Sequence, residues 1–522
     1  MHGRSITLAV AGTLLFTTAC TERGDSPSAP TAAVTAAAEK TWTVAFKGNG
    51  LPADVDKLVA DAGGTIVARV PEIGAIGVSS ANPNFGTAVK SKAGVLAADV
   101  AGEVKLITPP SDGLGAASAD NNGGNFSPAG SDPQGEPDAL GNQQWDKMRM
   151  NVSLTGSYAI QRGRSEVKVA VLDTGADQGH PDIAPNLSPQ FPAGLSKSFV
   201  PSEPTIQDFN GHGSWCLSAV GAPINAIGIS GVAPNVTLVA LKVLGATGSG
   251  TFLGVAQALV YSGQQHFDIA SMSFSGYLEK NTDHADYIIT HRAIEFARSN
   301  GVLPIAALSN ENFDVSDGSF FRSFIVAPAE IAGVIGVSAT GYFNNKAFYS
   351  NYGMGQTDVS APGGSTRDYR GIPGVGGLPP GAPYAGIGRV LGAWSLTGVD
   401  LSPTNDPNLE VNHCTGPSNT PPCYPYAWIQ GTSMATPNAA GVAALIISQY
   451  GDFPGGNKGH MSPTQVEQIL QISANNQPCP SPRTVTAGPG FFIPTATCSG
   501  DVGYNNFFGK GIVDAVKAVT LH

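Results

Sequence analysis

The chain has 522 residues, which is too long for one compact core and fits two domains with loose segments between them. Glycine (66 residues) and proline (39 residues) are frequent while only 13% of residues are charged, as in loop-rich exported α/β proteins. The net charge of −11 is spread out without a basic run, so nucleic-acid binding is not expected. No apolar run after the N-terminal segment is long enough to cross a membrane.

Residues 1–20 have the pattern of an export signal. Arg4 is followed by an apolar run over residues 6–16 and by small residues up to Cys20. This end resembles a bacterial lipoprotein box, in which Cys20 would carry lipid, although Thr17 stands where leucine is usual. Plain secretion without lipid is the open alternative. A lipid on Cys20 would be the only attachment of the protein to a membrane.

The next segments are a tether and a small domain. Residues 21–40 are rich in Ala, Thr, Ser and Pro without periodicity, which predicts a disordered tether. Residues 41–106 predict a β-α-β-β-α-β order, that of a ferredoxin-like unit. The predicted elements are strands over 42–46, 64–70, 75–78 and 102–106, a helix over 51–62, and a second short helix before the last strand.

Residues 107–142 are rich in Pro, Gly, Ser, Asn and Asp, which is typical of an exposed linker that proteases can cut. A folded unit, a cleavable linker and a larger domain suggest a propeptide, and two permanently joined domains are the alternative. In the larger domain, residues 143–522, apolar strands alternate with helices, which predicts a mostly parallel sheet covered on both faces. Residues 364–426 predict a surface-loop insertion. The strands are expected over 167–172, 236–243, 269–274, 302–308 and 334–339, and helices over 254–262 and 287–299.

Residues 431–437, Gly-Thr-Ser-Met-Ala-Thr-Pro, lie at the start of an apolar run that predicts a buried helix. Thr432 or Ser433 is a natural N-cap for that helix. The hydroxyl of Ser433 would then stand beside unpaired N–H groups and the positive end of the helix dipole, where a nucleophile could develop negative charge. A serine that merely caps the helix is the alternative.

Two other stretches supply what a serine nucleophile needs. The predicted strand 167–172 is followed by Asp173-Thr174-Gly175, and His212 lies between two glycines. A neutral serine requires a base, and the base requires an acceptor that fixes its tautomer. The three stretches, with the residues around them, resemble the catalytic boxes of the subtilisin-like serine proteases, the subtilases, in the same Asp, His, Ser order. The matching stretches are 171–175 with 180–182, then 210–213, then 431–437.

The resemblance covers about residues 143–520 and implies a three-layer α/β subtilisin-like domain with serine endopeptidase activity. It implies that Ser433 is the nucleophile, His212 the general base and acid, and Asp173 the orienting carboxylate. Asn310, at the end of the stretch 304–310, takes the position of the family's oxyanion-hole asparagine. Residues 41–106 resemble the inhibitory propeptide, so a zymogen is expected.

The resemblance also places a peptide cleft and a metal site. Strand-like segments of small residues would hold an extended substrate backbone; their residues are Gly248, Ser249, Gly250, Ser273, Phe274 and Ser275. No cofactor is expected for catalysis. A structural Ca²⁺ is expected on oxygen donors at the family's calcium position, with an ordinary glycine turn as the alternative. These donors are Asp182, Asn225, Gln144 and the carbonyls around Pro223, Ile227 and Ile229.

The cysteines suggest local disulfides and one free thiol. Two pairs flank Pro-rich loops, and local bridges within each pair are the economical prediction, although other pairings are open. They are Cys414 with Cys423 and Cys479 with Cys498. Cys216, four residues after His212, resembles the proteinase K branch of the family, and we interpret it as a buried structural thiol.

The sequence thus predicts a monomeric endopeptidase whose partners are protein or peptide substrates and its own propeptide, residues 41–106. Ser309 stands where the family commonly has glycine, next to the primary specificity pocket, so the peptide specificity is open. A catalytically idle binding protein with the subtilase fold is the alternative of a different class. A third interpretation is a hydrolase that uses the same triad on esters or amides.

Overall fold

The computed structural model describes residues 39–109, 138–317, 323–366, 388–399, 410–416, 420–453, 459–487 and 495–521. The predicted export signal, the tether up to residue 38 and the linker residues 110–137 lie outside the described residues. Contacts group residues 39–522 into one compact unit. Within the described ranges, no helix combines the length and apolarity that a bilayer crossing requires.

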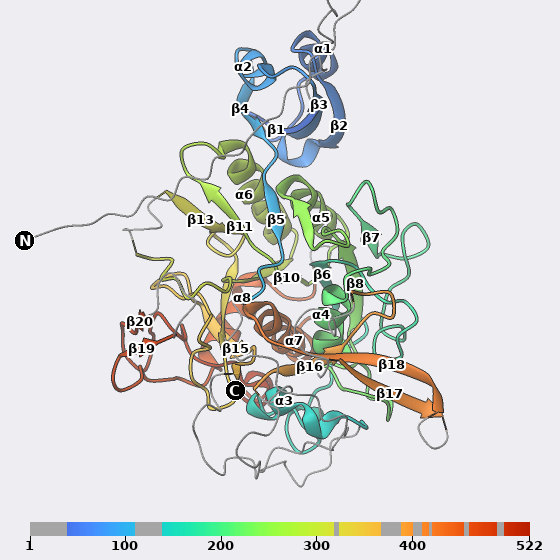
Figure 1. Cartoon of the computed structure of the whole chain (residues 1–522), viewed down its shortest axis with the longest axis vertical. Helices are drawn as coiled ribbons and strands as arrows, with labels where there is room; N and C mark the ends of the chain where they lie inside the picture. Colours follow the sequence, from blue (N-terminus) through green and yellow to red (C-terminus); the bar gives the residue numbers. More distant parts are fainter. Residues whose placement is uncertain are drawn as a thin grey trace, which may run out of the picture. The chain divides into compact units, whose positions relative to one another are not determined.

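The N-terminal domain has the predicted β-α-β-β-α-β order and an antiparallel sheet with strands in the order β2-β3-β1-β4 (Figure 1, blue). Its helices cover a core that includes Trp42, Val44 and Phe85. Residues 42–46 of β1 are all buried, because this strand lies inside the sheet between β3 and β4. The elements are β1 (Lys40–Phe46), α1 (Val55–Asp61), β2 (Thr65–Val70), β3 (Ala75–Ser80), α2 (Phe85–Lys90) and β4 (Val95–Val100).

The predicted last strand, residues 102–106, forms in part, but it does not belong to the sheet of this domain. The fourth strand of the sheet is β4, whereas residues 103–105 form β5 (Glu103–Lys105), which pairs with β9 (Ser249–Thr251) of the larger domain. The local sequence cannot distinguish these partners, because both pairings satisfy the same backbone groups. Residues 103–105 therefore pair with the larger domain and not with the sheet of the N-terminal domain.

The larger domain is built on a seven-stranded sheet in the order β15-β14-β12-β10-β6-β8-β7, with every pairing parallel. The predicted mostly parallel sheet is confirmed. β7 and β15 were not predicted, because two and four residues are too few for a clear periodicity. The strands are β6 (Lys168–Asp173), β7 (Lys197–Ser198), β8 (Thr237–Lys242), β10 (Ile269–Met272), β12 (Leu303–Ala307), β14 (Ile335–Thr340) and β15 (Val359–Pro362).

Helices cover both faces of this sheet (Figure 1). On one face lie α4 (His212–Gly221) and α7 (Thr432–Tyr450), and on the other α5 (Phe252–Gln264) and α6 (His284–Ser299). Successive side chains of a strand point to opposite faces. Accordingly Val169 and Val171 of β6 pack with α4 and α7, while Ala170 and Leu172 pack with α5 and α6. The three-layer prediction is confirmed.

The predicted loop insertion contains strands. β16 (Val390–Ala393), β18 (Thr420–Ile429) and β17 (Glu410–Gly416) form an antiparallel sheet in that order, and Tyr426 and Trp428 of β18 are buried. Buried aromatic residues explain why this Pro-rich segment is ordered.

A separate two-stranded sheet, β11 (Gly276–Glu279) and β13 (Phe324–Ala327), lies beside α6. Short elements complete the described part: η1 (Pro71–Ile73), η2 (Gly141–Gln143), α3 (Trp145–Arg149), η3 (Ser157–Ala159), α8 (Pro463–Ile472), β19 (Thr484–Thr486), β20 (Thr495–Thr497) and α9 (Ala515–Val519).

The structure contains both expected disulfide bonds, Cys414–Cys423 between β17 and β18 and Cys479–Cys498 beside β19 and β20.

The last residues of the expected linker, from residue 138 on, are packed against the larger domain instead of forming an exposed segment. Asp138 is buried, and its Oδ1 accepts the N–H groups of Asn225 and Ala226 at 3.0 and 2.6 Å. The larger domain therefore begins by residue 138.

Candidate active site

Three neighbouring strands, β6, β10 and β12, end beside the predicted site residues. Asp173 is the last residue of β6, Ser273 follows β10 directly, and Asn310 follows β12 by three residues. The carboxyl ends of parallel strands meet at one edge of a sheet, where ligands commonly bind. His212 and Ser433 join that group as the first and second residues of α4 and α7.

Asp173 and His212 are joined by a 2.8 Å hydrogen bond between Oδ1 and Nδ1. The carboxylate is 1% exposed, and the same oxygen accepts the N–H of Thr174 at 2.8 Å. Since Nδ1 is engaged by the carboxylate, Nε2 remains as the imidazole atom that can take a proton from another group.

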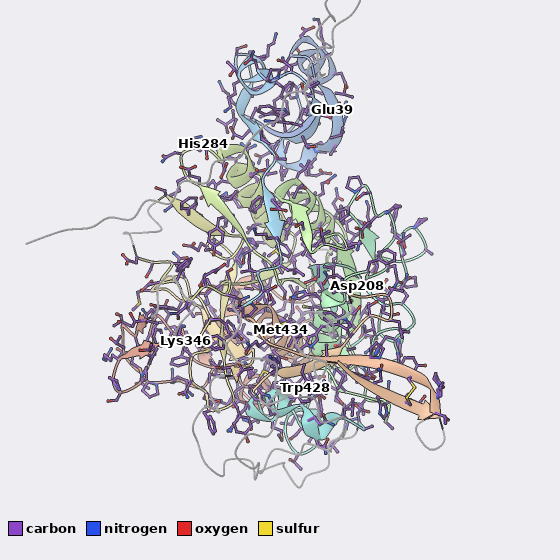
Figure 2. The ribbon with its side chains drawn as sticks, in the orientation of Figure 1. Glu39, Asp208, His284, Lys346, Trp428 and Met434 are labelled. Atoms are coloured by element: carbon purple, nitrogen blue, oxygen red, sulfur yellow. A yellow bond between two sulfur atoms is a disulfide. The ribbon has the colours of Figure 1, made fainter. Side chains whose placement is uncertain are left out.

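The loops that carry Asp173 and His212 are tied together by Thr174 and Asp208. Thr174 Oγ1 accepts the N–H of Gly213 at 2.8 Å and donates to Asp208 Oδ1 at 2.9 Å. Asp208, labelled in Figure 2, is fully buried at the start of α4, where the helix dipole favours a carboxylate. It accepts three further backbone N–H groups, at distances of 2.8–2.9 Å, from Asn210, Gly211 and Ser214. The residues next to Asp173 and His212 are therefore held against each other.

A proline inside α7 helps to place Ser433. Pro437 has no N–H, so it cannot bond to the carbonyl of Ser433 four residues earlier. That carbonyl accepts the hydroxyl of Ser273 at 2.8 Å, and the Ser433 hydroxyl donates to the Ser273 carbonyl at 2.9 Å. This reciprocal pair holds Ser433 at the helix start. Within the described residues, no hydrogen bond joins Ser433 to His212.

The expectation that Thr432 or Ser433 caps α7 was wrong. Gly431 is the N-cap residue, and its position supplies no side-chain cap. Asn310, which is distant in sequence, supplies the side-chain cap. Its Oδ1 accepts the N–H and the hydroxyl of Thr432 at 2.9 and 3.0 Å. With its oxygen held in this way, Asn310 donates through Nδ2 to the carbonyl of Ile107.

Glu311 stabilises the unusual backbone before Asn310. Ser309 has a φ of 80°, a left-handed conformation that favours glycine, which explains why glycine is common there in the family. Its hydroxyl donates to Glu311 Oε1 at 3.1 Å, and the N–H of Asn310 donates to Glu311 Oε2 at 3.0 Å. Asn351 Nδ2 also donates to Oε2 at 2.8 Å. These bonds hold Asn310 in place.

The six predicted cleft residues differ in what they contact. Gly248, Ser249, Gly250 and Ser275 contact residues 103–106 through backbone pairing. Phe274 is 1% exposed and belongs to the core beneath the cleft. Ser273 is engaged with Ser433 rather than with the paired segment. The structure therefore brings four of the six to a peptide backbone.

Cys216 is free and fully buried below His212, with 3.7 Å between its Sγ and His212 Nδ1. Its thiol donates to the Ser433 carbonyl at 3.8 Å. Burial raises the pKa of Cys216 well above its usual value. A thiol that stays protonated is a poor nucleophile, which agrees with the structural role expected for it.

The expected calcium donors lie close together. Asn225 Nδ2 donates to Asp182 Oδ1 at 3.3 Å, and Ile229 N–H and the Tyr426 hydroxyl donate to Asp182 Oδ2 at 3.0 and 2.7 Å. Burial raises the pKa of Asp182 to about 7. Gln144 is bound at both ends of its side chain to the backbone of Ser230, at 3.0 Å each. Within the described residues, no hydrogen bond reaches the carbonyl oxygens of Pro223, Ile227 and Ile229.

The N-terminal domain contacts the start of α6. Asp286 is fully buried, with Oδ1 accepting the Thr43 hydroxyl and Oδ2 the Gly102 N–H, each at 2.7 Å. Conversely, Asp99 Oδ2 accepts the N–H of Ala285 at 2.8 Å. Burial raises the pKa of Asp286 to about 6.

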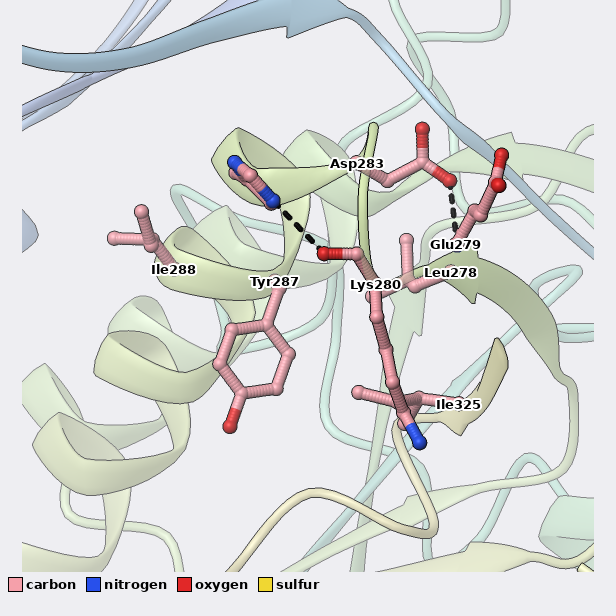
Figure 3. A pocket seen from close by; sticks show the side chains of 8 residues that line it. Leu278, Glu279, Lys280, Asp283, Tyr287, Ile288 and Ile325 are labelled. Atoms are coloured by element: carbon pink, nitrogen blue, oxygen red, sulfur yellow. Dashed lines mark hydrogen bonds between the residues drawn. The ribbon is translucent and has the colours of Figure 1, made fainter. Parts of the chain in front are cut away.

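A separate pocket of about 350 Å³ lies between β11, α6 and β13 and is lined by none of the predicted site residues (Figure 3). Asp283 Oδ2 accepts the N–H of Glu279 at 2.7 Å, and His284 Nε2 lies 2.8 Å from the Lys280 carbonyl (Figure 3). These contacts stabilise the turn before α6, and so the position of Asp286.

Four residues that organise the site were not found from sequence: Thr174, Asp208, Glu311 and Thr432. Thr174 and Thr432 lie within the matching stretches, directly beside Asp173 and Ser433, so adjacency was a usable signal. Asp208 and Glu311 carry no local pattern that separates them from loop carboxylates, since their role depends on donors from several segments.

The family model described as the subtilase family matches residues 164–511. An alkaline protease of Alkalihalobacillus alcalophilus is 35% identical over 282 residues, which make up 54% of this chain and 54% of the relative. Subtilisin Savinase of Lederbergia lenta is 34% identical over 282 residues, 54% of this chain and 76% of the relative. The chain spans about half the length of the first of these curated relatives.

Among solved structures, the epidermin leader peptide processing serine protease of Staphylococcus aureus matches with a TM-score of 0.65 at 20% identity. The match covers 93% of this chain and 98% of that one. At this identity the likeness shows the fold, and it extends over nearly the whole chain.

Proposed function

Because the chain belongs to the subtilase family, we propose that it is a serine endopeptidase that acts through Asp173, His212 and Ser433. One observation carries the proposal: a peptide segment lies in the cleft as an added strand, and its Ile107 carbonyl accepts the amide of Asn310. A site that pairs with an extended backbone favours peptide bonds over simple esters.

In the proposed reaction, Ser433 Oγ attacks the substrate carbonyl while His212 Nε2 takes its proton. A hydroxyl has one proton, so Ser433 must first exchange the Ser273 carbonyl for His212 as its acceptor. Asp173 keeps the imidazole oriented and stabilises its charged form. Asn310 Nδ2 and the Ser433 N–H, which has no acceptor among the described residues, bind the oxyanion. His212 then protonates the leaving amine, and water hydrolyses the acyl-enzyme.

The same observation supports synthesis as a zymogen. Residues 103–107 occupy the cleft that a substrate would need. Two hydrogen bonds anchor the N-terminal domain beside them: Asp286 of α6 accepts the N–H of Gly102, and Asp99 accepts the N–H of Ala285. Activity would thus require that this segment is cut and leaves.

Replacement of Ser433 by alanine tests the assignment. Ser433→Ala is expected to abolish casein hydrolysis and to leave the chain uncut before residue 138, with circular dichroism like that of the wild type. Normal proteolysis by this variant would rule out Ser433 as the nucleophile.

Labelling with a fluorophosphonate separates an enzyme from an idle binding protein with the same fold. The reagent should modify the processed protein on Ser433, as read by peptide mapping, because only an activated serine reacts. An unlabelled Ser433 in a processed, folded protein would favour the idle binding protein.

The donor set around Asp182 fits a hard cation such as Ca²⁺, because it offers a carboxylate, an amide oxygen and carbonyls without hydrogen bonds from described residues. Asp182, Asn225 and the carbonyls of Pro223, Ile227 and Ile229 would hold the ion, and Gln144 would add an oxygen. The ion would stabilise residues 223–229 and take no part in the chemistry. Added Ca²⁺ should raise Tm in the wild type but not in Asp182→Ala.

Export remains a proposal that rests on the N-terminal pattern and on two disulfides, which form in oxidising compartments. Lipid on Cys20 and a monomeric state stay predictions. Intact mass analysis of the mature protein would test the lipid, and sedimentation would test the oligomeric state.

A further inference from the structure

Residues 103–107 bind the larger domain as the middle strand of a three-stranded arrangement. On one side Glu103, Val104 and Lys105 pair antiparallel with β9. On the other side Lys105 exchanges two hydrogen bonds with Ser275, N–H to carbonyl at 2.9 Å and carbonyl to N–H at 3.1 Å. The N–H of Leu106 then donates to the Gly248 carbonyl at 2.9 Å. The backbone is thus held in one register up to residue 106.

That register selects one carbonyl of the segment. Asn310 Nδ2 donates to the oxygen of Ile107, and Thr432 fixes the orientation of this amide by binding its oxygen. A donor that stabilises an oxyanion must bind the oxygen of the carbonyl that is attacked. The attacked carbon would therefore be that of Ile107.

We propose that the bond between Ile107 and Thr108 is the first that the enzyme cuts, in its own chain, and that residues 104–107 show the class of substrate it prefers. This inference rests on the function proposed above. Ser433 Oγ forms an ester with the Ile107 carbonyl carbon, and the nitrogen of Thr108 leaves with a proton from His212. Water then cleaves the ester, so that Ile107 ends in a carboxylate and Ser433 regains its proton.

The side chains of the segment indicate the preferred substrate. Val104 is fully buried in the apolar cluster that contains Phe252 and Leu244, whereas Glu103 and Lys105 are exposed. Leu106 is half-buried over Gly248, where an added Cβ would lie 3.0 Å from its Cδ1. The preferred substrate would therefore carry a branched aliphatic side chain at the position of Val104 and an aliphatic side chain at the position of Ile107, the residue whose carbonyl is attacked. A charged residue in place of Val104 would be buried without a partner.

The inference differs from a first cut farther along the chain, within residues 109–137. Cleavage after Ile107 releases a fragment that ends in Ile107 and leaves residues 108–137 on the larger domain. A cut in the linker by another molecule would give a longer first fragment and a rate that rises with protein concentration. An intramolecular cut is independent of concentration.

The test follows the full chain over time by intact mass and uses one matched pair of variants. The earliest released fragment should end at Ile107 at the same rate over a tenfold dilution series. Val104→Asp should slow its release at least about tenfold, and Lys105→Asp, which changes an exposed side chain, should not. A first fragment that ends at any residue other than Ile107 would overturn the inference.

A peptide assay separates this inference from the proposed function. A blocked peptide of residues 102–109 should be cut between Ile107 and Thr108 by the processed enzyme, and its Val104→Asp analogue at least about tenfold more slowly. Hydrolysis of casein without discrimination between the two peptides would overturn the substrate class and leave the endopeptidase assignment intact. Failure on casein as well would overturn both.

Discussion

The two halves of the candidate site are positioned by different parts of the chain. Asp173 and His212, the histidine half, are held by hydrogen bonds between residues at most 39 apart in sequence. Ser433 and Asn310, the serine half, depend on Ser273 and Thr432, across separations of 160 and 122 residues. The histidine half is therefore nearly local, whereas the serine half exists only when α7 packs against the sheet. We expect the serine half to be the more sensitive to changes in packing.

The largest effect is expected from Asn310, in the serine half. Asn310→Ala should lower kcat by about 10²–10³, the range known for loss of this donor in subtilisin, with little change in KM. Steady-state kinetics on a peptide substrate would measure this. Asn310→Asp keeps an oxygen for Thr432 but lacks the donor, so it should lose as much; retention of activity by that variant would show that the donor is not needed.

Loss of the Thr174 hydroxyl tests the histidine half. Thr174→Val removes the acceptor for Gly213 N–H and a donor to Asp208, so His212 can shift, and kcat should fall by up to about 10². KM should hardly change, because Thr174 does not touch the cleft segment. Thr174→Ser restores the hydroxyl and should restore kcat. Equal activity of the valine and serine variants would contradict the positioning role.

The serine half also contacts the N-terminal segment directly, because Asn310 binds the Ile107 carbonyl and the N-terminal domain holds that segment in place. While the N-terminal domain is bound to the larger domain, burial raises the pKa of Asp286 to about 6. This pKa should return to its usual value of 3.8 once the N-terminal domain dissociates. The buried acid then favours the bound state at low pH, and this advantage is lost as pH rises through about 6. Binding of the cut N-terminal segment should be about tenfold weaker at pH 8 than at pH 5.

Competition binding against a fluorescent active-site ligand would measure this dependence. Asp99 and Asp283 also lie near Asp286 and favour its neutral form. Asp286→Asn, which keeps an acceptor but cannot ionise, should flatten the profile. An unchanged profile in that variant would assign the pH dependence to other groups.

The smallest effect is expected at Cys216, which touches both halves. Cys216→Ala removes a weak donor to the Ser433 carbonyl, which Ser273 continues to bind. We expect unchanged kcat and a loss of about 1 kcal/mol in the free energy of unfolding, measured by urea titration. A large fall in kcat with normal stability would mean that the thiol positions His212.

The sequence by itself predicted the candidate catalytic residues and determined the main layers. Asp173, His212 and Ser433 lie in stretches recognisable from a few adjacent residues, and long apolar strands alternating with helices require a covered parallel sheet. These features depend on residues that are neighbours in the chain, so they can be identified without a structure.

Only the tertiary structure decided how these residues are held. The missing N–H of Pro437 has a consequence only because Ser273 reaches the Ser433 carbonyl, and Asn310 caps α7 in place of the predicted Thr432 or Ser433. The strand at residues 103–105 was predicted, but its partner was not, because any exposed strand edge offers the same hydrogen-bonding groups. Which donor meets which acceptor over more than 100 residues is set by packing, and no local pattern records it.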